Sequence, residues 1–373
     1  MSTEFGGLVQ GRMNGAPNIK VVGIGGGGSN AIERMFVKPI PGVEYVVMNT
    51  DLQAIQRSNV PHRVQLGQRL TRGLGVGGDP EIGRLAAEEN RDELAEILQG
   101  ADMIFLGAGM GGGTGTGAAP IVADVARESG ALTVAMVTKP FAFEGNRRRK
   151  QAEDGVHRLK DKVDSLIIIP NDRLSAVCSE EVTIHNAFSM ADDVLNQGVQ
   201  AIAELVTVPG EINLDFADVK TVMAQAGPAW MGIGYGSGES RALQAAREAV
   251  ACPLLEVSIE GSRGVLFNIA GGENLTLMEV QAAADCIGQV VDPDANIFFG
   301  MMIDPAMEND VRITIIATGF PSSETIVNIR EQDLAKLIGG QTAVDQGPDI
   351  DLPPFLRNSP FARRRLTSPL DGI

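Results

Sequence analysis

The sequence has few of the residues that mark a nucleic-acid binder. Aromatic residues make up 4% of the 373 positions, with one Trp and two Tyr, too few for a surface on which successive bases stack. The 31 Lys and Arg residues are outnumbered by 47 Asp and Glu residues, which gives a net charge of −16. A nucleic-acid binder needs a basic face. We therefore expect no nucleic-acid partner.

Cysteines and long hydrophobic runs are also scarce. The three cysteines, Cys178, Cys252 and Cys286, are far apart and odd in number. This pattern indicates reduced, buried residues of a cytoplasmic protein, not disulfides or a zinc site. No apolar run reaches the ~18 residues of a membrane span, and residues 1–17 lack the basic and apolar segments of a signal peptide. With 44% hydrophobic residues, the chain is expected to be a soluble globular protein.

Glycine, in contrast, is abundant, and it is densest between Gly107 and Gly117, where seven of the eleven residues are glycine. The apolar run before this stretch, 101–106, predicts a buried strand, and residues 118–126 after it predict a helix. A glycine loop between strand and helix points backbone N–H groups at one spot, beside the positive end of the helix. The stretch therefore predicts a phosphate cradle, although it lacks the lysine of a P-loop.

Two further glycine clusters lie at similar junctions. Gly23, Gly25 and Gly28 follow a predicted strand and match the dinucleotide pattern G-x-G-x-x-G. Asp51 follows the strand predicted at 43–47, and it either binds a ribose or caps the helix that starts at Leu52. The third cluster, 73–80, precedes a helix predicted over 80–98. Three glycine loops favour a triphosphate over a dinucleotide, so a nicotinamide-dependent oxidoreductase is the less favoured alternative.

The order of elements predicts the fold class. Strands and helices alternate from residue 18 to about 183, which predicts an α/β, doubly wound, mostly parallel Rossmann-like domain with its ligand at the carboxyl ends of the strands. One long helix is predicted over 183–208. Next come a turn-rich segment (224–237), helices at 240–251 and 276–290, and strands at 254–259, 265–269, 297–303 and 311–318. These predict a C-terminal α+β domain with a four-stranded sheet.

We expect six parts in the chain: a flexible tail (1–17), a nucleotide-binding domain (18–183), a central helix (184–208), the α+β domain (209–320), a linker (321–348) and a tail (349–373). Within the linker, the sequence of residues 331–338 is compatible with a short helix. In the last part, Phe355 and Leu356 follow two prolines, which favours a docking peptide.

Three pairs of side chains each allow two interpretations. Glu144 and Arg148 form either a solvated ion pair or contacts to a ribose and a phosphate. Phe188 and Asp192 share a helix face. They are either a core residue and a solvated acid, or two parts of a site that binds guanine. In the second case the carboxylate accepts from the purine N1–H and N2–H, a donor pair that adenine lacks.

The third pair, Asp215 and Asp218, is three residues apart, so both side chains project together. The two acids either favour the start of a helix that Asn213 caps or polarise a water and aid metal binding.

Taken together, the motifs resemble those of the tubulin/FtsZ GTPases. The stretch 111–117 resembles the family signature. Residues 25–30, 49–51, 138–148 and 213–218 are similar to bacterial FtsZ, not tubulin. The resemblance covers about residues 17 to 320 in order, and the tail segment 351–357 resembles a docking peptide.

The resemblance implies a cytoplasmic GTPase that polymerises head to tail into filaments of the division ring beneath the inner membrane. Asp215, Asp218 and Asn213 would enter the nucleotide site of the adjoining subunit and position the attacking water. GTP and GDP would carry Mg²⁺ mainly through their phosphates, without a metal site of protein ligands. Membrane-anchoring and regulatory division proteins would bind the tail through Asp351, Leu352, Pro353, Pro354, Phe355, Leu356 and Arg357.

The resemblance also implies the nucleotide-binding residues. These are Gly26, Gly27, Gly28, Ser29, Asn30, Asn49, Asp51, Gly77, Gly78, Gly109, Gly111, Gly112, Gly113, Thr114, Gly115, Thr116, Gly117, Glu144, Arg148, Asn171, Phe188 and Asp192. The sequence departs from the family at Gly78-Asp79, where Ala-Asn is common, and at Ser29, which replaces a frequent Asn or Gly. The first departure is expected to alter the flexibility of the loop and its grip on the γ-phosphate.

Overall fold

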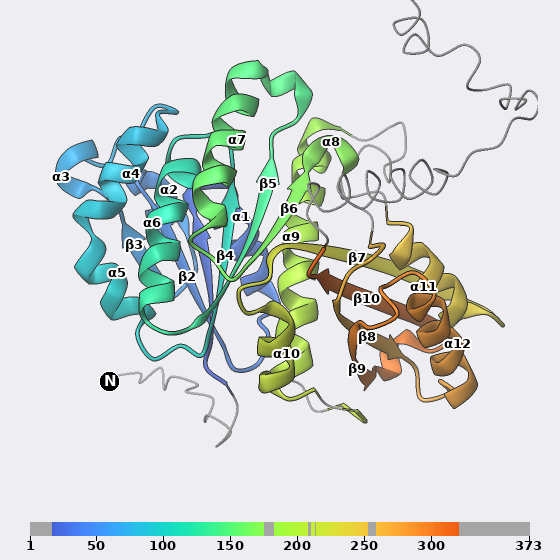
Figure 1. The fold of residues 1–373 in the computed structure, drawn as a ribbon. Helices are drawn as coiled ribbons and strands as arrows, with labels where there is room; N and C mark the ends of the chain where they lie inside the picture. The colour runs from blue at the N-terminus through green and yellow to red at the C-terminus, as the bar shows by residue number, and fades with distance from the viewer. Residues whose placement is uncertain (1–16, 175–182, 208–209, 213, 253–258, 321–373) are drawn as a thin grey trace, which may run out of the picture. The chain divides into compact units, whose positions relative to one another are not determined.

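The computed structural model describes residues 17–174, 183–207, 210–212, 214–252 and 259–320 (Figure 1). Several expectations lie outside these residues: the tail 1–16, Asn213, residues 254–258 of one predicted strand, the linker with its helical segment 331–338, and the docking peptide 351–357. These expectations stay predictions.

Alternating strands and helices make up the first half of the described chain, as the sequence predicts. The elements are β1 (Ile19–Ile24), α1 (Gly25–Val37), β2 (Val43–Asn49), α2 (Leu52–Arg57), β3 (His62–Gln65), α3 (Gln68–Thr71), α4 (Pro80–Glu89), α5 (Arg91–Leu98), β4 (Met103–Gly109), α6 (Thr114–Glu128), β5 (Leu132–Lys139), η1 (Ala142–Glu144), α7 (Asn146–Lys160), β6 (Ser165–Pro170) and α8 (Asn171–Leu174).

The long helix α9 (Ile184–Thr207) comes next, within one residue of its predicted ends. After it come α10 (Phe216–Met223), β7 (Gly227–Ser237), α11 (Arg241–Val250), β8 (Gly264–Gly271), α12 (Leu277–Gly288), β9 (Asn296–Ile303), η2 (Pro305–Met307) and β10 (Asp310–Thr318). No described helix is both long enough and apolar enough to cross a membrane.

The strands form one sheet in the order β3-β2-β1-β4-β5-β6-β7-β10-β8-β9. Strands β1 to β6 are parallel, so their carboxyl ends share one edge. β7 joins the two parts of the sheet, because its first residues pair in parallel with β6 and the rest pair antiparallel with β10. β10, β8 and β9 complete the four-stranded C-terminal part.

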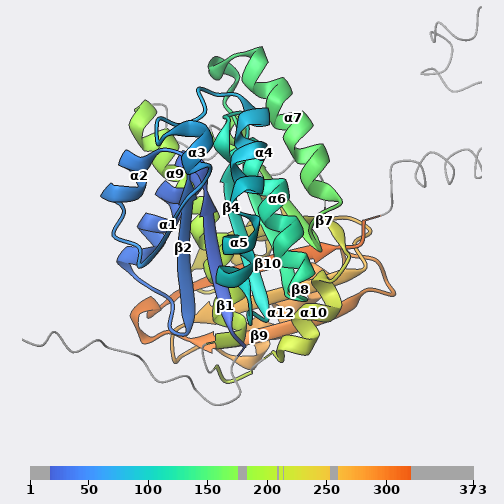
Figure 2. The same cartoon turned by 90° about the vertical axis from the view of Figure 1, so that its left-hand side faces the viewer.

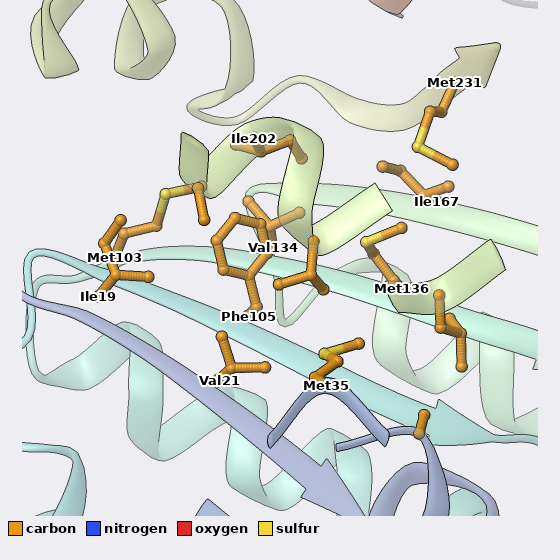
Figure 3. Packing of buried hydrophobic residues seen from close by; sticks show 14 of the residues in the cluster. Ile19, Val21, Met35, Met103, Phe105, Val134, Met136, Ile167, Ile202 and Met231 are labelled. Carbon is orange, nitrogen blue, oxygen red and sulfur yellow. The ribbon is translucent and has the colours of Figure 1, made fainter. Parts of the chain in front are cut away.

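Both faces of the inner parallel strands, β1, β4, β5 and β6, are buried. Ile19 and Val21 of β1 pack on one face, in the hydrophobic cluster that includes Met35 of α1 and Ile202 of α9 (Figure 3). Val22 and Ile24 pack on the other face with α4, α5, α6 and α7. Figure 2 shows these helices on the two sides of β1, β2 and β4. Burial on both faces explains why the strands are almost uniformly apolar.

The prediction of a turn-rich segment at 224–237 is wrong, because most of these residues form strand β7. Gly232, Gly234 and Gly236 alternate along β7 on the face that α11 covers. A Cβ on Gly234 would lie 2.0 Å from the carbonyl oxygen of Ala245. The glycines therefore serve close packing between helix and strand, and they follow the two-residue period of a strand.

The prediction of a single helix over 80–98 is also wrong, since the segment divides at Asn90 into α4 and α5. Asn90 has φ −104° and ψ 15°, outside the helical region. Its side-chain oxygen accepts a hydrogen bond from the backbone N–H of Gly67 at 2.8 Å. This contact fixes the break and holds the segment between β3 and α3.

Candidate functional site

A cavity of about 700 Å³ lies at the carboxyl ends of the parallel strands. This is the edge at which doubly wound sheets bind their ligands, and the volume suits a nucleotide-sized molecule. Its lining includes the following predicted site residues: Gly26, Gly27, Asn30, Asn49, Asp51, Gly77, Gly78, Gly109, Gly112, Gly113, Thr114, Gly115, Glu144, Arg148, Asn171, Phe188 and Asp192.

Five predicted residues, Gly28, Ser29, Gly111, Thr116 and Gly117, do not line the cavity. Gly28, Gly111, Thr116 and Gly117 pack against or hydrogen-bond to the backbone behind the cavity, whereas the buried Ser29 Oγ has no hydrogen-bond partner in the described part of the chain. A Cβ on Gly28 would lie 2.2 Å from the carbonyl oxygen of Gly107 in β4, and one on Gly117 would lie 1.9 Å from that of Pro80 in α4. The hydroxyl of Thr116 accepts from the N–H of Gly111 at 2.8 Å.

Glycines and the first turns of two helices line the part of the cavity that we call its floor. Helices α1 and α6 both begin there, and neither has a side-chain hydrogen bond at its N-cap. The first N–H groups of a helix have no partner within it, and the helix dipole adds positive potential. Arg148 is the only Lys or Arg among the described lining residues. The floor is therefore built to hold an anion mainly by backbone.

The third glycine cluster covers one side of this floor. Gly77 (φ 58°) and Gly78 (φ 80°) both lie in the left-handed region, and no atom would crowd a Cβ at either position. Glycine at 78 therefore relieves backbone strain there. The carboxylate of Asp79 caps α4 by accepting from the N–H of Glu81 at 2.9 Å. Gln151 of α7 donates to the carbonyl oxygen of Gly78 at 3.3 Å.

Two carboxylates at the rim are engaged within the chain. Asp51 Oδ1 accepts from the N–H of Gln53 at 2.8 Å and caps α2, which confirms the capping interpretation. Glu144 Oε2 accepts from Arg148 Nη1 at 2.6 Å, and Glu144 Oε1 accepts from the N–H of Phe141. Glu144 is the last residue of η1 and Arg148 lies in α7, so the pair spans the turn between them.

Helix α9 brings an aromatic ring and a third carboxylate to the cavity. Phe188 is 42% exposed and meets Phe141 edge-on, with ring centroids 5.4 Å apart. Asp192 Oδ2 lies 3.2 Å from Arg34 Nε, and its side chain is 15% exposed. Burial raises the pKa of Asp192 to about 6, Arg34 opposes this rise, and Asp193 adds to it.

Asn171, the first residue of α8, adds a polar group without a partner. The residue is 5% exposed, it lines the cavity, and its Oδ1 has no hydrogen-bond partner in the described part of the chain. A buried acceptor without a partner is costly. This oxygen is therefore available to a ligand donor.

The acidic pair lies elsewhere. Asp215 precedes α10, and its N–H donates to Asp218 Oδ2 at 3.3 Å. The far end of α10 meets the amino end of β6, where the Ser165 hydroxyl donates to the Met223 carbonyl oxygen at 2.6 Å. The cavity lies at the carboxyl ends of the strands, so the structure does not bring the acidic pair to the cavity of its own chain.

Sequence reasoning missed several lining residues, among them Thr50, Thr138, Gly75, Val76 and Ala191. Thr50 stands between two predicted residues, and Thr138 ends β5, so their places at carboxyl strand ends were available signals. Gly75 and Val76 belong to the third glycine cluster. Ala191 has no distinguishing signal in the sequence.

Two family models match the chain. The tubulin/FtsZ family GTPase domain matches residues 18–179, and the FtsZ family C-terminal domain matches residues 227–321. The two matches span nearly the same range as the resemblance in the sequence.

Solved structures agree with these matches. An empty FtsZ dimer from M. jannaschii is 43% identical over 82% of this chain and 89% of that chain, with a TM-score of 0.79. The GDP-bound monomer of CetZ1 from Haloferax volcanii is 20% identical over 86% of this chain and 99% of that chain, with a TM-score of 0.71, and shows the shared fold. The chain belongs to the tubulin/FtsZ family, with the C-terminal domain of FtsZ, and it is a GTPase that binds GTP and GDP.

Proposed function

We propose that this GTPase polymerises head to tail and hydrolyses GTP where two subunits meet. The observation that carries the proposal is the placement of two groups at opposite ends of the parallel strands. The cavity lies at the carboxyl ends, whereas α10, which begins at the acidic pair, meets the amino end of β6 through its last residue, Met223. Stacking one subunit on the next along the strands would bring the acidic pair to the neighbouring cavity.

The carboxylates in the cavity support the need for a second subunit. The three that line it in the described chain, Asp51, Glu144 and Asp192, are each engaged by a backbone N–H or an arginine. None is free of such a contact within the chain, although Asp51 uses only Oδ1 in the hydrogen bonds that hold it. Asp215 is exposed and Asp218 is half-buried, so both can meet a partner. Phosphoryl transfer depends mainly on positioning and electrostatics, which an incoming acidic pair would supply.

The contacts in the cavity suggest how the nucleotide is held. The phosphates would lie on the N-termini of α1 and α6 and on the loop 73–78, with Glu144 and Arg148 beside the ribose and phosphates. Phe188 would stack on the base, Asn30 and Asn171 would contact its edge, and Asp192 would accept from N1–H and N2–H of guanine.

The donor set fits Mg²⁺ held mainly by phosphate oxygens. The described residues hold no cluster of three or more His, Cys, Asp or Glu side chains. Mg²⁺ commonly binds through substrate phosphates and water, and here it would neutralise charge on the phosphates. Asp51 lines the cavity beside the end of β2 and would accept a hydrogen bond from a water bound to Mg²⁺.

The cellular role rests on the family. Head-to-tail contacts that do not close a ring give open filaments. We propose that these filaments form the division ring in the cytoplasm, beneath the inner membrane. Residues 351–357 would bind membrane-anchoring and regulatory division proteins.

The first experiment measures GTP turnover per subunit against protein concentration. Turnover should rise above a critical concentration if the site is completed by assembly. Asp218→Asn should bind GTP normally and barely hydrolyse it. Asp92→Asn, which changes an exposed acid in the first turn of α5, is the matched control and should behave as wild type. Turnover per subunit that is independent of concentration would contradict the proposal.

A mixing experiment separates hydrolysis across subunits from hydrolysis within one. Asp218→Asn keeps the cavity and loses the acid, whereas Asp192→Ala weakens the cavity and keeps the acid. In an equal mixture, random head-to-tail contacts pair an intact cavity with an intact acid in about a quarter of interfaces. Activity should recover toward that fraction, although each variant alone is nearly inactive. Hydrolysis within one subunit predicts no recovery.

A further inference from the structure

Two buried threonines join two of the loops that form the cavity. Thr50 follows β2, Thr114 opens α6, and their hydroxyl oxygens lie 2.7 Å apart. Thr50 is fully buried, Thr114 is 9% exposed, and both line the cavity. The two residues are 64 positions apart in the sequence, so the fold alone brings them together.

The backbone around Thr50 is held from the opposite side. The hydroxyl of Thr71 in α3 contacts the carbonyl oxygens of Thr50 and Gly67, at 3.4 Å and 3.0 Å, and accepts from the N–H of Gly73 at 3.2 Å. The N–H of Leu52 also donates to the carbonyl oxygen of Gly73. These contacts fix Thr50 against the start of the third glycine cluster, so its hydroxyl has a defined position.

The direction of the hydroxyl pair depends on what occupies the cavity. Each hydroxyl carries one proton and can accept through two lone pairs, so only one of the two threonines donates to the other. If Thr114 donates, its lone pairs face the cavity. If Thr50 donates, the proton of Thr114 is free to point into the cavity. A phosphate oxygen only accepts, so an anion on the N-terminus of α6 favours the second arrangement.

We propose that Thr50 is a positioning residue that directs the hydroxyl proton of Thr114 toward a phosphate of the bound nucleotide. The inference rests on the proposed placement of phosphates at α6. The Thr50 hydroxyl donates to Thr114 Oγ, and the Thr114 hydroxyl donates to the phosphate. Donation from Thr50 polarises the second hydroxyl and strengthens its hydrogen bond to the anion. Thr50 acts through Thr114 and does not touch the nucleotide.

The test is a double-mutant cycle on nucleotide affinity. Binding of GTPγS, a slowly hydrolysed GTP analogue, is measured by calorimetry in the presence of Mg²⁺ and below the assembly concentration. Thr50→Val removes the hydroxyl at nearly constant shape, and we expect about a three- to tenfold loss of affinity, because the hydrogen bond that it removes joins two neutral hydroxyls. Thr50→Ser keeps the hydroxyl and should bind within about twofold of wild type.

The second arm of the cycle shows whether Thr50 acts through Thr114. In a Thr114→Ala background, Thr50→Val should cost almost nothing more, because the group that it orients is gone. An equal loss in both backgrounds would overturn the proposal, as would unchanged affinity of Thr50→Val. Thr133→Val, a fully buried threonine near the amino end of β5, controls for loss of a buried hydroxyl and should leave affinity unchanged.

Further measurements distinguish a folding defect, and a failure of the proposed function, from a failure of this inference. Circular dichroism and the urea midpoint show whether Thr50→Val folds, and Thr50→Ala supplies the cycle if it does not. If wild type itself binds no GTPγS, the proposed phosphate placement fails along with this inference. If wild type binds and only the cycle fails, Thr50 has no positioning role and the proposed assembly mechanism stands.

Discussion

Arg34 of α1 and Asp192 of α9 form an ion pair across the rim of the cavity, with Nε 3.2 Å from Oδ2. The same guanidinium donates from Nη2 to the hydroxyl of Ser189 at 2.8 Å. Burial nevertheless raises the pKa of Asp192 to about 6, against the effect of Arg34 and with a contribution from Asp193. The residue proposed to recognise guanine therefore titrates close to neutral pH.

The affinity for GDP should fall as the pH decreases through 6. Only the ionised carboxylate of Asp192 accepts from both guanine donors, and with a pKa of about 6 its ionised fraction falls about tenfold between pH 7 and pH 5. We expect a similar loss of affinity in calorimetric titrations. The phosphates of GDP also titrate, so Asp192→Asn, which cannot ionise, is measured alongside. An equal pH dependence in both proteins would contradict the role of Asp192.

The stability of the empty protein should change with pH in the opposite direction: it should rise as the pH decreases. The pKa of Asp192 is raised from its ordinary value of 3.8 to about 6, so folding disfavours the ionised form. Stability from this group is greatest below pH 4 and is lost as the pH rises toward 6. At pH 7, the unfolding free energy of Asp192→Asn should therefore be about 1–2 kcal/mol higher than that of wild type, so the variant is the more stable protein. Urea titrations at pH 7 and pH 4 check this, and the difference should nearly vanish at pH 4.

The glycine signature contains positions with different roles, which predicts different mutant phenotypes. A Cβ on Gly117 would lie 1.9 Å from the carbonyl oxygen of Pro80, so Gly117→Ala must separate α6 from α4. We expect a loss of about 2–3 kcal/mol in unfolding free energy, as for other overpacked sites. A Cβ on Gly112 meets nothing within 4 Å, and this residue lines the cavity.

Gly112→Ala is therefore the matched control. It should keep nearly the stability of wild type in urea titrations, and any defect should be in GTP binding. If Gly112→Ala were as unstable as Gly117→Ala, the division between packing and ligand-facing glycines would be wrong.

Much of the cavity could be predicted from the sequence because its residues lie at the junctions where strands meet helices. Alternating strands and helices place such junctions at one sheet edge, so the three glycine clusters were expected to meet. The sequence did not distinguish residues that face the cavity from those behind the loop. Gly115 lines the cavity and Gly117 lets α6 pack closely against α4, although both belong to one repeating pattern. That distinction depends on which helix packs against which residue.

Strand β7 was not predicted from the sequence. Its glycines indicated turns, because glycine is common in turns. In the structure, Gly234 pairs with Ile313 of β10 and faces α11. The sequence does contain a two-residue alternation of Gly232, Gly234 and Gly236 with larger residues. Only the close approach of α11 explains it, and α11 follows β7 in the chain.

Replacement of Gly234 by alanine should destabilise the C-terminal part of the sheet. The added Cβ would lie 2.0 Å from the carbonyl oxygen of Ala245 and 2.4 Å from the nitrogen of Ala249, both in α11. Backbone atoms cannot move aside without shifting the helix, so we expect a loss of about 2–3 kcal/mol by urea denaturation. Gly288→Ala, at the end of α12 in open space, should be neutral or slightly stabilising. Equal effects of the two substitutions would contradict this packing argument.

An ion pair between α11 and α12 should control the acid stability of the C-terminal part of the chain. Arg241, 5% exposed, donates from Nε to Glu279 Oε1 at 2.8 Å and from Nη2 to the carbonyl oxygen of Asn274 at 3.1 Å. The pKa of Glu279 is lowered from 4.5 to about 2, mainly by the hydrogen bond from Arg241 and also by contacts with Thr276, against the effect of burial.

The lowered pKa of Glu279 fixes the sign of the pH effect. A carboxyl whose pKa falls on folding contributes stability above its unfolded pKa, and that stability is lost as the pH decreases. The window here runs from pH 4.5 down to about 2. Glu279→Gln removes the charge and should lower the unfolding free energy at pH 7 by about 2 kcal/mol. Between pH 4.5 and pH 2 the difference from wild type should shrink in urea titrations, whereas a difference that stays constant would show that shape, not charge, holds Arg241.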